Sequence, residues 1–201
     1  MASEGLTRRE ALRRMLWEKL ENWRWSRADN ALGRALAHFR GVPHRIEFLG
    51  SRKLHRLDSG LMLLSRYPLL PIPDTIPHRT LRVRGSTPAG SDPESAAAYV
   101  RFEEFGDCAR FDCWAAKGVG YVRIDLNGRP LHLFFTHMQA SYGSDDDRGE
   151  RETAGVRANQ RSEIVEFVTR VAGAGLAHGE SALLVGDLNV DGSADLTGGI
   201  P

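Results

Sequence analysis

The sequence has little cysteine and no long apolar run, and both absences narrow what the protein can be. Two cysteines in 201 residues are too few for a disulfide-stabilised scaffold. No apolar stretch approaches the length that crosses a bilayer, and residues 1–14 carry charges instead of the apolar core of a secretion signal. Cys108 and Cys113 match no common zinc signature. They can pair if their Cα atoms lie within reach, but we expect them to be reduced and half-buried.

The overall composition predicts a folded globular domain. The chain is 41% hydrophobic and 26% charged, which permits a real core and excludes a disordered chain. The net charge of +1 conceals an asymmetry, because residues 1–57 hold 13 Lys and Arg against 6 Asp and Glu. A basic segment of this kind can bind phosphate groups or an anionic membrane. A solvated helix surface is the simpler interpretation.

Apolar residues recur at helical spacing near both ends of the sequence. The spacing predicts one helix over about residues 8–23, a second ending near Gly41, and a third over 156–172. The polar stretch 141–155, which contains three adjacent aspartates, predicts a solvated loop before the third helix.

Strand patterns lie between these helices. The clearest is the alternation of apolar and polar residues over 119–136, interrupted by Asn127-Gly128. Both turn residues tolerate positive φ, so this segment predicts an antiparallel hairpin. Further strands are predicted over residues 59–65, 80–83 and 182–185, the first and last of them buried.

Polar side chains follow two of these strands at the point where each strand ends. Asp187 and Asn189 stand in Gly-Asp-Leu-Asn after one strand, and His137 stands in Thr-His-Met-Gln after another. In extended geometry Asp187 and Asn189 point the same way, where they can orient a water near a hard cation. His137 can donate to a phosphoryl oxygen. Each motif alone also fits an ordinary turn.

Taken together, the two motifs enclose a βαβ-like unit, and other segments agree with them. Residues 59–68 read SGLMLLSRYP and residues 156–160 read VRANQ. With these segments the chain resembles the endonuclease/exonuclease/phosphatase superfamily, metal-dependent phosphoesterases of DNase I-like fold. The resemblance implies an α+β, four-layer α/β/β/α sandwich, incomplete at both termini. It implies a partial domain over 41–201, preceded by a helical segment over 1–40 outside the family pattern.

Within the superfamily, the chain is most similar to neutral sphingomyelinases. Residues 105–118 read FGDCARFDCWAAKG, and THMQASYG follows the next predicted strand. Asp112 and Lys117 match an acid–lysine pair that lies beside the active site in that branch and switches it. A surface ion pair is the alternative interpretation.

The resemblance also implies roles for the strand-end residues. Asp187 would bind the metal and position or activate the attacking water, and Asn189 would bind the phosphate. His137 would stabilise the charged transition state, and Mg²⁺ or Mn²⁺ would polarise the phosphate. The implied activity is that of a sphingomyelin phosphodiesterase of phospholipase C type. Its partner would be a phospholipid headgroup at a membrane surface.

The chain departs from the family pattern at both ends. The family's main metal ligand is a Glu in a Gln-Glu motif, to which residues 16–22 (LWEKLEN) are weakly similar; this makes Glu18 the candidate. The helical spacing equally places Glu18 on a solvated face. No histidine follows Asn189 to serve as the family's general acid/base. We therefore expect a truncated, poorly active enzyme with poorly covered apolar sheet edges.

Two further interpretations stay open. A nuclease of the same superfamily would use the basic N-terminal segment and Trp17, Trp23 and Trp25 for charge and base stacking. An inactive remnant would instead bind a membrane or a partner through the same helix. No feature of the sequence assigns a compartment or an oligomeric state.

Overall fold

The fold is known from a computed structural model that describes residues 42–50, 59–73, 76, 82–86, 97–142, 147–173, 176 and 180–190. The chain divides into two compact units, Met1–Val42 and Pro43–Pro201, and every element described below lies in the second. The strands are β1 (His44–Gly50), β2 (Leu63–Ser65), β3 (Leu69–Leu70), β4 (Arg82–Ser86), β5 (Val100–Glu104), β6 (Gly118–Asp125), β7 (Pro130–His137) and β8 (Ser181–Asp187). The helices are the 3-10 helix η1 (Arg110–Trp114) and α4 (Asp147–Ala172).

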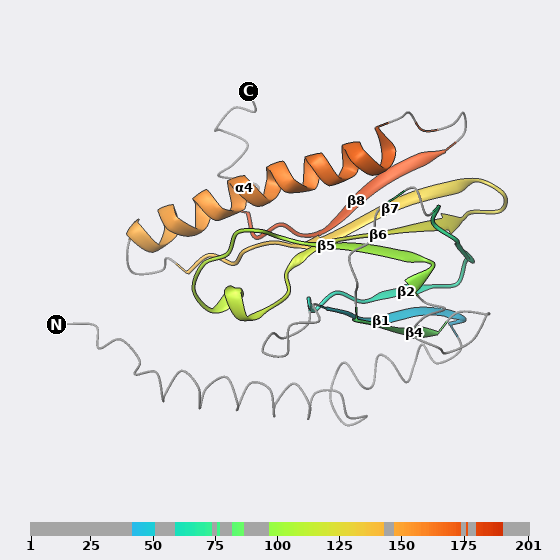
Figure 1. The fold of residues 1–201 in the computed structure, drawn as a ribbon, viewed down its shortest axis with the longest axis horizontal. Coiled ribbons are helices and arrows are strands. Elements are labelled where there is room, and N and C mark those ends of the chain that lie inside the picture. Colours follow the sequence, from blue (N-terminus) through green and yellow to red (C-terminus); the bar gives the residue numbers. More distant parts are fainter. Residues whose placement is uncertain are drawn as a thin grey trace. The chain divides into compact units, whose positions relative to one another are not determined.

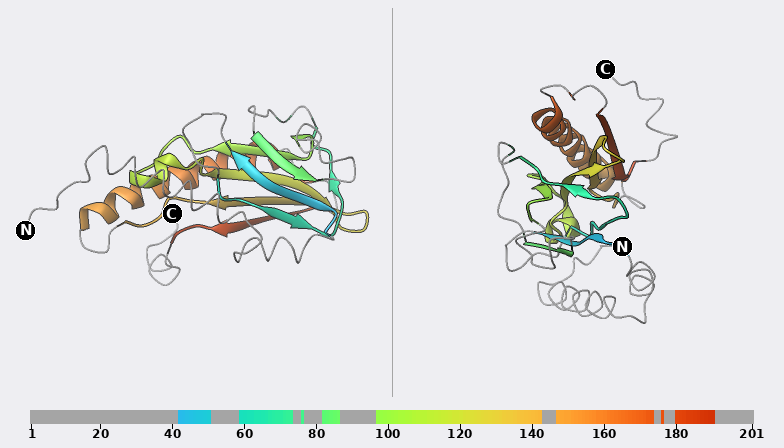
Figure 2. Two further views of the ribbon diagram at one scale, coloured as in Figure 1. Left: turned by 90° about the horizontal axis from the view of Figure 1, so that it is seen from below. Right: turned by 90° about the vertical axis from the view of Figure 1, so that its right-hand side faces the viewer.

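Two sheets and one helix form successive layers (Figure 1). The smaller sheet has the order β2-β1-β4, and the larger one the order β3-β6-β7-β8 with β5 also paired to β6. Seen from the side, the larger sheet lies between the smaller sheet and α4 (Figure 2). The α+β class with a mixed sheet is thus confirmed. The described residues form three layers of the predicted four, and the first two predicted helices lie outside the described residues.

Each interface between layers has its own apolar core. One core joins the two sheets and the other joins the larger sheet to α4. The first consists of Ile46, Leu49, Leu69, Val100, Phe102, Val122, Ile124, Leu133 and Phe135. The second consists of Ile72, Phe105, Val119, Tyr121, Phe134, Met138, Ile164 and Phe167. Successive residues of β6 and β7 alternate between the two cores because side chains along a strand alternate faces.

The hairpin predicted over residues 119–136 is confirmed. β6 and β7 pair antiparallel, with Asp125 opposite Pro130 at the turn end. Asn127 and Gly128 occupy the turn with φ of +57° and +85°. The dipeptide therefore sits where its tolerance of positive φ is required.

Helix α4 is longer than predicted, and the loop prediction for residues 141–155 is wrong from Asp147 onwards. Some polar residues of its early turns are buried instead of facing water. Thr153 is fully buried, and the buried guanidinium of Arg157 bonds to the Ser141 hydroxyl outside the helix at 3.0 Å. A polar sequence alone does not distinguish such packing from a solvated loop.

The predicted strand over 182–185 exists as β8, but the prediction that it is buried is wrong. Every residue of β8 is exposed, and Leu183, Leu184 and Val185 each keep more than 40% of their surface in water. Among the described residues, β8 pairs only with β7. Its apolar side chains are thus poorly covered. The predicted buried strand over 59–65 is only partly formed, as β2, and Leu63 and Leu64 in it are half-buried.

None of the described helices is long and apolar enough to cross a membrane.

Candidate functional site

The ends of the parallel strands β7 and β8 bring two of the predicted site residues side by side. His137 is the register partner of Asp187, and the backbone N–H of Met138 donates to the Asp187 carbonyl at 2.9 Å. Gly186 makes this approach possible. Its φ is +146°, and a Cβ there would lie 2.0 Å from the Thr136 carbonyl oxygen. The imidazole and the carboxylate thus stand at one edge of the sheet.

Asn189 joins them through a turn and not through extended backbone, so that part of the prediction is wrong. Its φ is +51°, in the left-handed region that Asn tolerates better than most residues. Its backbone N–H donates to the Asp187 carboxylate at 2.9 Å. Its side-chain amide donates to the Met138 carbonyl, also at 2.9 Å. The turn fixes the Asn189 side chain beside the segment that follows His137.

The predicted acid–lysine pair is formed, and it is buried. Lys117 Nζ lies 2.7 Å from Asp112 Oδ2, with the two side chains only 8% and 11% exposed. This burial removes the surface ion pair as an interpretation. Such a pair needs further hydrogen bonds to offset the loss of hydration.

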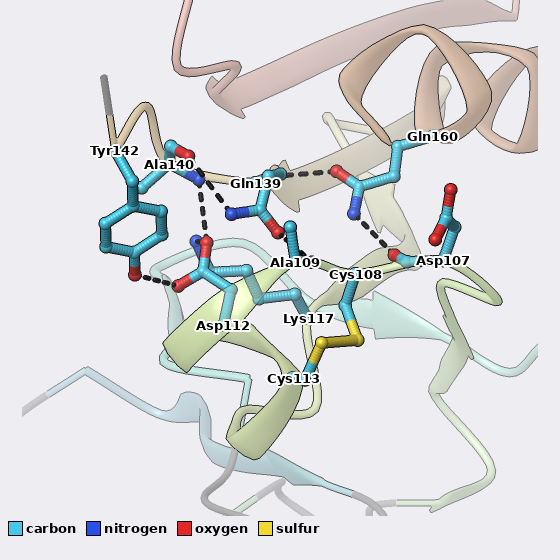
Figure 3. The surroundings of a disulfide bond; sticks show 10 residues. All are labelled: Asp107, Cys108, Ala109, Asp112, Cys113, Lys117, Gln139, Ala140, Tyr142 and Gln160. Carbon is cyan, nitrogen blue, oxygen red and sulfur yellow. Dashed lines mark hydrogen bonds and ion pairs between the residues drawn. A yellow bond between two sulfur atoms is a disulfide. The ribbon is translucent and has the colours of Figure 1, made fainter. Parts of the chain in front are cut away.

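Those bonds are present on the carboxylate (Figure 3). Asp112 Oδ2 also accepts from the backbone N–H of Ala140 at 2.7 Å. Asp112 Oδ1 accepts from the hydroxyl of Tyr142 at 2.9 Å. The carboxylate on η1 therefore holds the chain that continues from β7.

Lys117 in turn contacts His137. Its ammonium group donates to the Met138 carbonyl at 2.7 Å and lies 3.3 Å from His137 Nε2. An ammonium can only donate, so Nε2 must be the acceptor. We assign the proton of the neutral imidazole to Nδ1 on this basis.

The surroundings of His137 favour its neutral form. Burial, first, and the Lys117 ammonium, second, lower the pKa of His137 below its usual 6.5. The carboxylates of Asp187 and Asp112 oppose this shift. The result at neutral pH is an uncharged ring that can donate from Nδ1. A Cβ built on Gly60 would lie 4.0 Å from that nitrogen, so the Ser59–Gly60 corner passes beside it.

Cys108 and Cys113 form a disulfide, so the expectation of a reduced pair is wrong. Their Cα atoms are 5.1 Å apart, because η1 folds the intervening residues back into a tight turn. The bond encloses Asp112. Sequence spacing alone did not settle whether the two Cα atoms would come within reach.

The structure also identifies two residues that the sequence analysis quoted only as letters of longer motifs. Gln139 and Gln160 are fully buried beside the disulfide and bond to each other (Figure 3). In the sequence, each of them is an uncharged amide side chain, one just after a predicted strand and the other in the predicted third helix. That signal is weak, because glutamine is usually exposed.

A cation site is only partly supplied by the described residues. They contain no group of three or more His, Cys, Asp or Glu side chains arranged to hold a metal ion. Asp187 and Asn189 offer the oxygen donors that a hard cation such as Mg²⁺ takes, and Asp187 is exposed. Glu18, the other expected ligand, lies outside the described residues.

Comparison with known proteins gives distant, partial homology to bacterial sphingomyelinase C and phospholipase C. The chain is 40% identical over 79 residues to a sphingomyelinase C of Leptospira interrogans, which is 39% of this chain and 13% of the relative. It is 35% identical over 82 residues to a phospholipase C of Staphylococcus aureus, 40% of this chain and 23% of the relative. Separately, residues 13–56 match the C-terminal domain of a family of unknown function, DUF6866.

Solved structures match over a larger part of the chain. Sphingomyelinase C from Streptomyces griseocarneus superposes with a TM-score of 0.56 and 25% identity, over 84% of this chain and 51% of that one. A beta toxin mutant of Staphylococcus aureus with bound magnesium ions gives 0.52 and 22%, over 76% and 45%. The chain thus shares part of the sphingomyelinase C fold, and it spans about half of these solved structures.

Proposed function

We propose that this protein hydrolyses a phosphodiester with the help of a divalent metal ion, and that its substrate is sphingomyelin. The observation that carries the proposal is the pairing of His137 with Asp187 at the ends of β7 and β8, with Asn189 bonded beside them. A carboxylate can act as a general base, and an imidazole and an amide can donate hydrogen bonds to the charged phosphate. The partial homology to sphingomyelinase C supports the choice of substrate.

The side chains of the site suit separate tasks. Asp187 is exposed and carries a carboxylate that can orient a water and accept its proton. His137, held neutral and bonded at Nε2, can donate from Nδ1 to a phosphoryl oxygen as negative charge grows there. Asn189 can hold the phosphate through the part of its amide that does not bond to the backbone.

We propose Mg²⁺ or Mn²⁺ as the cofactor. Among the described residues Asp187 would be its ligand, and Glu18 is the proposed second ligand. When bound, the ion polarises the phosphate and offsets charge on the leaving group.

The protein would bind its substrate at a phospholipid surface, and exposed rings on η1 could contact that surface. Phe111 and Trp114 on this helix are 45% and 43% exposed. Residues three apart in a 3-10 helix lie above one another, so the two rings share a face. The Trp114 ring, with its N–H, favours a membrane–water boundary, and the Phe111 ring adds apolar surface beside it. Most of the basic N-terminal segment proposed for membrane or nucleic-acid binding, including its three tryptophans, lies outside the described residues.

The test is hydrolysis of sphingomyelin vesicles by the full chain with and without Mg²⁺. We expect metal-dependent release of phosphocholine that falls roughly 10²- to 10³-fold in His137→Gln, on the scale of a lost oxyanion donor. Asp187→Asn should lose roughly 10²- to 10⁴-fold. Glu166→Gln, an exposed change on the outer face of α4, is the matched control. Activity that survives both site changes would refute the proposal, and metal-dependent nicking of plasmid DNA without lipid hydrolysis would favour a nuclease.

A further inference from the structure

Two buried glutamines connect helix α4 to the loop that carries Asp112. Gln139 and Gln160 are 0% and 1% exposed. The backbone N–H of Gln139 donates to Gln160 Oε1 at 2.8 Å, and Gln160 Nε2 donates to the Asp107 carbonyl at 2.9 Å. A single side chain of α4 thus bonds both to the segment after β7 and to the loop before η1.

The side chain of Gln139 holds the same loop at a second point. The backbone N–H of Ala109 donates to Gln139 Oε1 at 2.9 Å, and Gln139 Nε2 donates to the Ala140 carbonyl at 3.0 Å. The bonded residues, Asp107 and Ala109, flank Cys108 of the disulfide (Figure 3). Both sides of that cysteine are therefore fixed from the interior.

The fixed loop leads directly to the imidazole of the site. Ala109 immediately precedes η1, and η1 carries Asp112. Asp112 holds the ammonium of Lys117 at 2.7 Å, and that ammonium lies 3.3 Å from His137 Nε2. Buried networks with bonded members hold their geometry closely.

We propose that Gln160 and Gln139 are positioning residues for His137, acting through the loop that holds Asp112 and Lys117. They keep the Lys117 ammonium on Nε2, and by doing so they keep the ring proton on Nδ1. Their value for catalysis rests on the proposed function, whereas their effect on the state of His137 does not.

A purely structural role makes a different prediction, and α4 offers controls that separate the two. Asn159, the neighbour of Gln160, donates to the Asp107 side chain at 2.8 Å from an exposed position. Asn159→Ala therefore removes a bond from the same helix to the same residue without opening the buried network. Ile164→Val trims the core under α4 one turn later and lowers stability without touching the network.

The test is the tautomer of the His137 ring in the full chain at one fixed alkaline pH, read by ¹⁵N NMR and assigned by comparison with His137→Gln. In Gln160→Met, which keeps the length of the side chain and loses both hydrogen bonds, we expect the pure Nδ1–H form to give way to a mixture with the Nε2–H form. Asn159→Ala and Ile164→Val should keep the tautomer of the unaltered protein. A folded Gln160→Met with an unchanged His137 tautomer would overturn the proposal.

A milder variant covers the case in which Gln160→Met does not fold. Gln139→Met keeps the backbone bond to Gln160 and loses the side-chain bonds to Ala109 and Ala140, so the same change should occur to a smaller degree. An unchanged tautomer again refutes positioning. Sphingomyelin hydrolysis is measured in parallel, where we expect kcat to fall and KM to stay. If the unaltered protein hydrolyses nothing, the proposed function fails, while the NMR result still decides the role of Gln160.

Discussion

Lys117 approaches Nε2 of His137 to 3.3 Å while its ammonium also bonds to Asp112 and to the Met138 carbonyl. The three contacts match the three N–H donors of an ammonium, so Lys117 has no donor left for a ligand. This lysine therefore sets the state of the imidazole and does not bind substrate. The opposite edge of the ring, at Nδ1, is the one available for chemistry.

The first prediction concerns stability at mildly acidic pH. The folded protein holds the pKa of His137 below 6.5, so the unfolded chain takes up the proton first as the pH falls. The stability that neutral His137 contributes is complete above about pH 6.5 and is lost as the pH drops through the folded pKa.

Urea unfolding between about pH 8 and about pH 5 measures this loss, and His137→Gln should show a shallower decline. His44, whose pKa burial also lowers, contributes a parallel decline to both proteins, so it cancels in the comparison. Parallel curves for the two proteins would contradict the prediction.

The second prediction concerns the buried ion pair. Asp112→Ala leaves the Lys117 ammonium without its counter-charge at a site only 8% exposed, and we expect a loss of about 3–5 kcal/mol. The control is Glu152→Gln, which breaks the exposed contact with Arg110 and should cost about 1 kcal/mol or less. Urea denaturation compares them, and equal losses would show that the Asp112 pair is no more important than a surface contact.

The third prediction uses two glycines in opposite situations. Gly186→Ala would bring a Cβ to 2.0 Å from the Thr136 carbonyl oxygen, so β8 must move away from β7 and stability must fall. Gly155→Ala places its Cβ in open space on α4, where alanine should add about 0.5–1 kcal/mol. Thermal unfolding gives the signs. A neutral Gly186→Ala would mean that the strand ends are not held as described.

The fourth prediction concerns the disulfide. Cys108 and Cys113 are five residues apart, and closing so short a loop is worth roughly 2 kcal/mol by chain entropy. We expect a reductant to lower the free energy of unfolding by about that amount. The doubly substituted Cys108→Ala, Cys113→Ala protein serves as the control, because it should not respond to reductant. If reductant lowered the free energy of unfolding equally in both proteins, the loss would not come from the disulfide.

Local patterns were enough to predict the elements whose formation is decided by near neighbours. The β6–β7 hairpin follows from alternation and from Asn127-Gly128, because both act within a few residues. The second half of α4 follows from its apolar spacing. The meeting of His137 with Asp187 also follows, since parallel strands joined by a helix end at one edge.

The amino-acid sequence by itself therefore determined the strand and helix that carry each polar motif, and the edge of the sheet where the motifs meet. Only the tertiary structure decided that β8 stays exposed, that Cys108 reaches Cys113, and that Lys117 faces His137. The first and last of these outcomes depend on which distant segments cover or approach a residue, and the second depends on the tight turn of η1. Periodicity reports the face on which a side chain lies, and it carries no information about what packs against that face.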